Sequence, residues 1–205
     1  NNRFFSPLGP SQFHLRCFPR WPNGNPKKIV QGYSNFRFRC QDYFGQGPRG
    51  QVLTDRRLIL DTNLLLLLLV GNTSKEYISE HKRLGAYSEK EYELLIKILP
   101  HESNIFVTPN ILTETSNLIG QIAEPARTKI LNFFSEYIES ANERYCESRQ
   151  AITRKEFIRL GLTDSVILHE MTDSFILLTA DLQLYLAAKK EGYEAVNFNH
   201  LRDYA

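Results

Sequence analysis

The chain has 205 residues, 42% of them hydrophobic and 23% charged, with a formal net charge of +2, a composition that permits a full hydrophobic core. Its three cysteines, Cys17, Cys40 and Cys146, form no CxxC pair, so the sequence excludes a disulfide framework and shows no zinc-binding spacing. We therefore expect a reducing, cytoplasmic location.

Residues 1–50 differ from the rest of the chain. They carry eight basic residues against one acidic residue, with six prolines, six glycines and ten aromatic residues. No helical or strand period persists there, and we expect an irregular extension that is disordered. One alternative is a basic arm whose aromatic residues, as in FRFRCQDYF at 36–44, stack on single-stranded bases. Another is that these residues are translated sequence upstream of the true start.

Residues 51–205 are predicted to form one domain in which strands alternate with helices. Apolar runs predict strands at 58–60, 105–107, 175–178 and 194–197. Apolar periodicity and capping residues predict helices from 64, at 88–99, from 109, at 126–140, at 155–160, at 163–171 and at 182–191. This alternation predicts an α/β fold, with a parallel sheet sandwiched by helices.

The leucine run Leu64–Val70 does not predict a membrane span. It contains seven apolar residues, whereas a spanning helix needs roughly 20. Asp61 precedes the run and Gly71 follows it. We therefore predict a buried helix and no membrane partner.

Four acidic residues flank the predicted apolar elements. Asp61 and Asp181 directly follow the first and third predicted strands, at the edge where parallel sheets place functional groups. Glu114 falls about 40° outside the apolar face of its helix, and Asp164 lies in the segment RLGLTDSVIL. Considered one at a time, each acid also fits a purely structural role, as a helix cap or as a solvent-exposed residue on the flank of a helix.

Taken together, the four acids suggest a metal site. Clustered carboxylates repel one another and burial raises their pKa values, whereas a divalent cation neutralises them. Oxygen ligands suit Mg²⁺ or Mn²⁺. The five histidines show no paired spacing and are expected to be surface or core residues.

Four segments together resemble the PIN-domain ribonuclease family, in the family's order and over roughly 56–200. They are LILDTN at 58–63, TPNILTE at 108–114, RLGLTDSVIL at 159–168 and LLTADLQL at 177–184. The resemblance implies a PIN-like sheet with its acids at one edge. It places the catalytic and metal-binding acids at Asp61, Glu114, Asp164 and Asp181, with Asn63 and Thr179 as polar helpers that orient them.

The implied activity is that of a Mg²⁺- or Mn²⁺-dependent endoribonuclease that hydrolyses phosphodiester bonds of single-stranded RNA. Within the family, the toxin of a toxin–antitoxin pair is one role, although the segment between Asp61 and Glu114 is longer than in compact toxins. An antitoxin protein and a second copy of the chain are further candidate partners. Candidate phosphate contacts are Arg127, Lys129, Arg154, Lys155, Lys189 and Lys190.

Two other functions compete with this one. A catalytically silent PIN-like module for RNA binding or scaffolding would not need all four acids. A phosphatase of the haloacid dehalogenase type also begins with an aspartate after a strand. That chemistry needs a second aspartate two positions on, where this chain has Asn63.

Overall fold

The computed structural model describes residues 57–100 and 104–202. These residues belong to the second of the two units into which the chain divides, Phe38–Ala205. The predicted extension over residues 1–50 lies outside the described residues.

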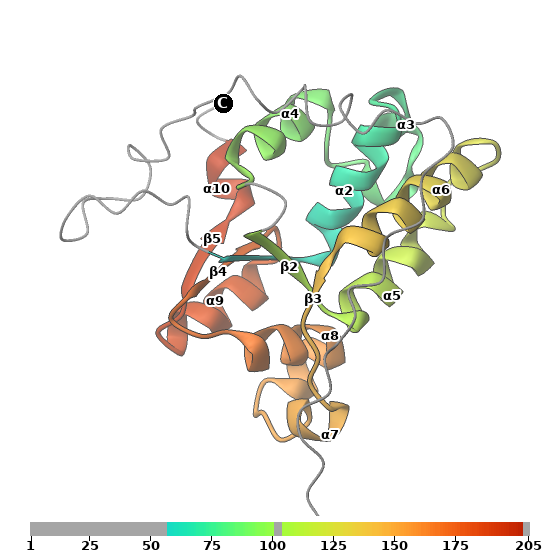
Figure 1. Ribbon diagram of the computed structural model, residues 1–205. Helices are drawn as coiled ribbons and strands as arrows, with labels where there is room; N and C mark the ends of the chain where they lie inside the picture. Colours follow the sequence, from blue (N-terminus) through green and yellow to red (C-terminus); the bar gives the residue numbers. More distant parts are fainter. Residues whose placement is uncertain (1–56, 101–103, 203–205) are drawn as a thin grey trace, which may run out of the picture. The chain divides into compact units, whose positions relative to one another are not determined.

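The described residues form an α/β domain around one five-stranded sheet (Figure 1). Every strand pair is parallel, and the spatial order is β3-β2-β1-β4-β5. The strands are β1 (Arg57–Leu60), β2 (Ile105–Val107), β3 (Asn142–Glu143), β4 (Phe175–Thr179) and β5 (Glu194–Asn197).

The predicted strands are confirmed, with one omission. β4 extends one residue beyond its predicted end and so includes Thr179. The omission is β3, which has only two residues, both polar, and therefore no apolar run to reveal it. It pairs with β2 through Phe106 and Val107.

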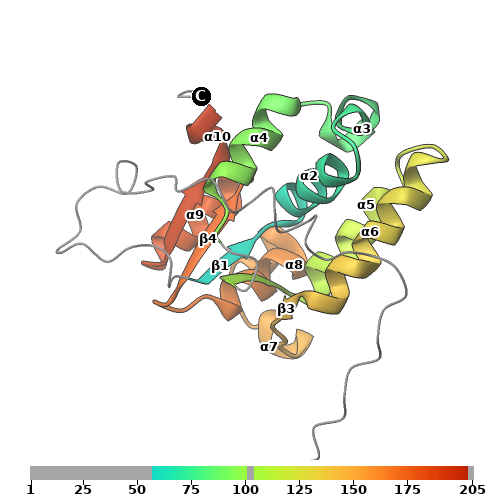
Figure 2. The ribbon, with the colours of Figure 1, turned by 45° about the horizontal axis from the view of Figure 1, so that its top comes forward.

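Helices connect the strands and cover the sheet (Figures 1 and 2). They are α2 (Thr62–Thr73), α3 (Glu76–Glu80), the 3₁₀ turn η3 (Lys82–Leu84), α4 (Glu89–Ile98), α5 (Pro109–Ile119), α6 (Ala126–Ser140), α7 (Ser148–Ala151), α8 (Phe157–Glu170), α9 (Leu182–Lys190) and α10 (Phe198–Arg202). The short elements α3, η3, α7 and α10 are additions to the predicted set, because three to five residues are too few to display a helical period.

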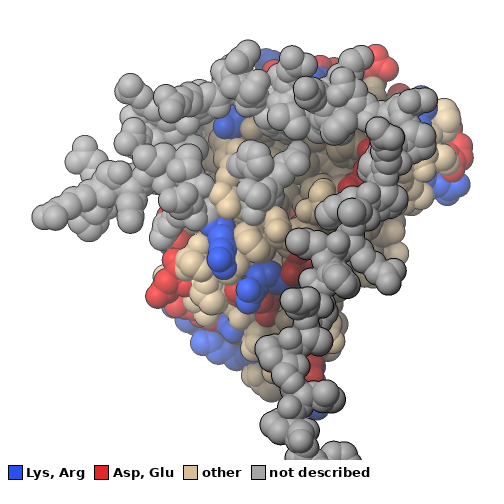
Figure 3. Space-filling view, viewed as in Figure 1, with Lys and Arg blue, Asp and Glu red and all other residues tan. Residues whose placement is uncertain are grey.

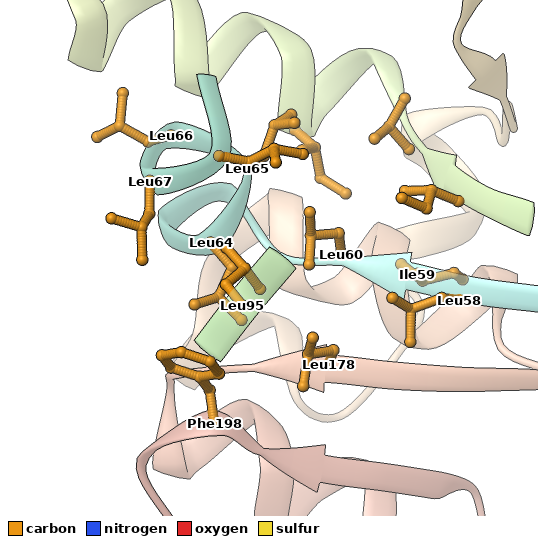
Figure 4. Close-up of a cluster of buried hydrophobic side chains, with 14 of the residues drawn as sticks. Leu58, Ile59, Leu60, Leu64, Leu65, Leu66, Leu67, Leu95, Leu178 and Phe198 are labelled. Atoms are coloured by element: carbon orange, nitrogen blue, oxygen red, sulfur yellow. The ribbon is translucent and has the colours of Figure 1, made fainter. Parts of the chain in front are cut away.

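The leucine run forms the buried helix that the sequence predicts. Leu64–Val70 are between 0% and 6% exposed, and α2 packs against α3, α4, α5 and α6. Figure 4 shows leucines of this run beside Leu60, Leu95 and Phe198. A helix that is apolar on all sides is stable in water only when other elements surround it, as they do here.

Helix α8 unites two segments that the sequence predicts as separate helices, 155–160 and 163–171. Its backbone is broken at Gly161, whose φ of 83° and ψ of −174° are not helical. A positive φ is a conformation that glycine adopts without the steric cost other residues incur. The prediction of two segments was therefore correct in substance, and the break lies immediately before the turn that carries Asp164.

In the part of the chain that the structure describes, no helix has the length and apolar character needed to cross a membrane.

Candidate functional site

Asp61 lies at the switch point of the sheet. The chain leaves β1 toward β2 but leaves β4 toward β5, so the crevice expected in such sheets lies beyond the carboxyl ends of β1 and β4. Asp61 follows β1 directly and is 3% exposed. Its Oδ1 accepts a hydrogen bond from the Leu64 N–H at 2.9 Å, and its Oδ2 accepts one from the Ala180 N–H at 2.8 Å and another from the Thr179 hydroxyl. Burial raises the pKa of Asp61, while these three donors favour its ionised form.

Thr179 ties Asp61 to Asp181. Its fully buried hydroxyl donates to Asp61 and accepts a hydrogen bond from the Asp181 N–H at 2.9 Å. Asp181 is exposed and caps α9, because its Oδ1 accepts from the N–H groups of Gln183 at 2.6 Å and Leu184 at 3.0 Å. Its Oδ2 receives no hydrogen bond from a described residue, so this oxygen remains available to a ligand.

Asp164 projects from α8 after the break at Gly161 and is partly buried. No residue in the described ranges donates a hydrogen bond to it, so the helix-cap interpretation of this acid is wrong. Burial, followed by repulsion from Asp181, Asp61 and Glu114, raises the pKa of Asp164 to about 7. The carboxyl therefore lies close enough to all three other acids to respond to their charge.

Glu114 lies on the flank of α5, as predicted, and is exposed. Its Oε2 accepts a hydrogen bond from the Thr62 hydroxyl at 3.2 Å. Thr62 is the residue after Asp61 and is 6% exposed, so it links the first helix of the site to α5. Residue spacing could not predict this contact, because the two residues are 52 positions apart.

The four predicted acids thus interact electrostatically, but they are not tightly packed. Within the described ranges, the group whose three candidate ligand atoms all lie within 4.8 Å of one another is Cys146, His169 and Glu170. No three of the four predicted carboxylates meet that distance. The four carboxylates therefore influence one another's charge without three of them forming a group as close as Cys146, His169 and Glu170.

Asn63 has a partner that sequence reasoning missed. The Arg83 Nε donates a hydrogen bond to the Asn63 Oδ1 at 3.0 Å. The buried ring of His81 accepts from the Arg83 N–H at 3.2 Å and so helps to hold this turn. Tyr87 also belongs to the surroundings of the site, since burial and the charge of Asp61 raise its pKa to about 12.

Four of the six predicted phosphate contacts have partners within the protein, including Lys155, whose Nζ lies 3.7 Å from a carboxylate oxygen of Glu156. Arg127 forms an ion pair with Glu124 at 2.7 Å. Arg154 pairs with Glu191, and both side chains are largely buried. The Lys129 Nζ donates to the hydroxyl of Tyr77 at 3.2 Å. Arg154 is therefore a structural residue, whereas Arg127, Lys129 and Lys155 are surface side chains with local partners.

Lys155 also lines a pocket of about 370 Å³, together with Lys190, on helices α8 and α9 and the turn before α8. The residues that line it are Lys155, Glu156, Arg159, Gln183, Leu186, Ala187 and Lys190. Arg159, which the sequence did not single out, donates to the side-chain oxygen of Gln183, two positions after Asp181. Lys189 is exposed and lies outside this lining.

Elsewhere on the surface, charges of the two signs are mixed. Figure 3 shows basic and acidic side chains interspersed over the visible described face. The pocket gathers three cationic side chains, Lys155, Arg159 and Lys190, around one acid, Glu156.

Comparison with protein-family models, with curated proteins and with solved structures finds no match to this chain. The assignment of a function consequently depends on the geometry and chemistry of the site itself.

Proposed function

We propose that the chain is a metal-dependent ribonuclease with a PIN-like fold, which hydrolyses phosphodiester bonds of RNA at the four acids. The observation that carries the proposal is the convergence of Asp61, Glu114, Asp164 and Asp181 at the switch point of a parallel sheet, where mutual repulsion contributes to a pKa of about 7 for Asp164. In this arrangement the ionised carboxylates raise one another's free energy. A bound cation would relieve that repulsion, which favours a metal-binding function.

The donor set fits Mg²⁺ or Mn²⁺, because all four side chains offer hard oxygen ligands. An ionised carboxylate has about four acceptor sites, and Asp61 uses three of them for its hydrogen bonds. One oxygen of Asp181 and the carboxyl of Asp164 accept no hydrogen bond from a described residue. The wide spacing of the acids suits ligation that is partly through water. A bound ion would supply a water of lowered pKa and would neutralise charge on the leaving oxygen.

The protein's own groups orient these ligands. Thr179 and the Ala180 N–H hold the Oδ2 of Asp61, and the Leu64 N–H holds its Oδ1, so this carboxylate is fixed on three sides. The Thr62 hydroxyl holds Glu114 in the same way from a neighbouring helix. The raised pKa of Asp164, about 7, means that its carboxyl would lose its proton if a cation bound there.

The pocket beside Asp181 supports a polyanionic substrate. Its three cationic side chains, Lys155, Arg159 and Lys190, lie on the two helices that carry Asp164 and Asp181 or directly before them. An RNA strand whose phosphates bind there would pass near the acids. The choice of single-stranded RNA, and a role as a toxin with an antitoxin partner, rest on the resemblance of the four sequence segments.

The test is cleavage of a labelled single-stranded RNA by the purified chain. We expect cleavage with Mn²⁺ or Mg²⁺, its loss with EDTA, and a fall of at least about 100-fold in Asp61→Asn. Asparagine is a good helix cap, so this variant should still fold. The matched control is Glu139→Gln, at an exposed position on α6, which should cleave like the wild type.

Equal cleavage by the wild type and Asp61→Asn would trace the activity to a contaminating nuclease and overturn the proposal. Metal-dependent RNA binding without cleavage would instead favour the silent binding module.

A further inference from the structure

A second group of candidate ligands lies at the far end of α8. The Sγ of Cys146, a ring nitrogen of His169 and a carboxylate oxygen of Glu170 all lie within 4.8 Å of one another. Glu170 is six positions after Asp164, a rise of about 9 Å along an ideal helix. The group is therefore separate from the four acids, and it does not depend on the function proposed for them.

The fold brings these three residues together from two segments. After β3, the Arg144 N–H donates to the Val107 carbonyl at 2.8 Å, so the chain continues along β2 for one more residue. This path carries Cys146 to the last turn of α8, where His169 and Glu170 lie. The cysteine spacing of the sequence predicted no zinc site because the other two ligands are more than 20 positions away along the chain.

Each of the three side chains has an atom free for a ligand. No described residue forms a hydrogen bond with the exposed ring of His169. Arg144 donates to the Oε2 of Glu170 at 2.7 Å and leaves Oε1 open. The Cys146 thiol makes only a weak contact, 3.7 Å from Sγ to the Glu147 carbonyl oxygen.

The chemistry of the group selects the cation. A thiolate, an imidazole and a carboxylate are the ligand types that Zn²⁺ takes at tetrahedral sites, whereas Mg²⁺ and Mn²⁺ prefer oxygen alone. The thiolate and the carboxylate together would match the charge of a divalent ion. Arg144 would orient the carboxylate from outside, as partners of metal ligands commonly do.

We propose that Cys146, His169 and Glu170 form a binding site for a zinc-class divalent cation, which ties the segment after β3 to the end of α8. Three protein ligands leave a fourth position for water. A thiol binds such a cation as its thiolate, so binding would displace a proton and should strengthen as the pH rises.

The test uses Co²⁺ as a spectroscopic substitute for Zn²⁺ in the full chain. The background is the double variant Cys17→Ser and Cys40→Ser, in which Cys146 is the one remaining thiol. We expect a thiolate-to-cobalt charge-transfer band that saturates at one equivalent and disappears when Zn²⁺ is added. Cys146→Ser should abolish the band.

Two further variants keep the test decisive if Cys146→Ser fails to fold. His169→Ala changes an exposed side chain and should weaken Co²⁺ binding at least about tenfold. Glu139→Gln, the matched control at an exposed position on α6, should leave the titration unchanged. Absence of the band at saturating Co²⁺, or equal affinity in His169→Ala, would overturn the proposal whatever the outcome of the RNA assay.

Discussion

Replacing Asp164 by asparagine tests whether the four acids act on one another. The pKa of this carboxyl rises from 3.8 to about 7 on folding, so the folded protein holds a proton that the unfolded chain releases above about pH 4. The free energy of unfolding therefore falls as the pH rises from about 4 to about 7 and is level above that range. At about 1.4 kcal/mol per pH unit, the full difference is about 4 kcal/mol, which solvent screening of this partly buried side chain reduces to about 2–3 kcal/mol.

Asp164→Asn has no proton to lose, so it should lack this part of the pH dependence. Without metal, we expect the variant to match the wild type near pH 4 and to be about 2–3 kcal/mol more stable at pH 8. Urea unfolding of both proteins at several pH values measures this difference in the free energy of unfolding. The other titrating groups are the same in both proteins, so their contributions cancel in the comparison. Glu139→Gln is the matched control and should follow the wild type throughout.

Metal should cancel most of this advantage. A cation that binds only the folded state adds about 2.7 kcal/mol at 100 times its dissociation constant. The wild type should gain about this amount in Mn²⁺ at pH 8, and Asp164→Asn should lose most of the gain. A variant that is less stable than the wild type at pH 8 without metal, or that responds to Mn²⁺ like Glu139→Gln, would refute the idea of a mutually repelling metal site.

Two further predictions concern the core and the pocket. In Gly71→Ala, the new Cβ would lie 2.2 Å from a ring carbon of the buried Tyr92. We therefore expect the free energy of unfolding, measured in urea, to fall by about 1–3 kcal/mol. Unchanged stability would show that the ring moves aside freely. In the double variant Lys155→Gln and Lys190→Gln, RNA binding should weaken, and the slope of log affinity against log salt should become shallower by about 1.4, at about 0.7 for each lost phosphate contact. Lys129→Gln lies outside the pocket and should keep the wild-type slope; equal slopes in all three proteins would exclude the pocket as a phosphate site.

Four of the five strands of the sheet, and the position of two acids on its edge, could be predicted from the sequence alone. Strands β1 and β4 are short apolar runs, and such runs are visible locally because burial on both faces needs apolar residues in succession. Asp61 and Asp181 follow those runs and also cap the next helices, so their place at the sheet edge required no knowledge of distant contacts. The leucine run was recognisable as a buried helix for the same reason.

The tertiary structure decided which side chains meet. Thr62 reaches Glu114 across 52 positions, and Thr179 reaches Asp61 across 118, distances along the chain at which residue spacing carries no information. The raised pKa of Asp164 arises from burial and from three charges on other elements, so only the folded arrangement produces it. Strand β3 likewise depends on pairing with β2, because two polar residues have no intrinsic tendency to form a strand without a partner that supplies the hydrogen bonds. The approach of Cys146 to α8 depends on the same pairing.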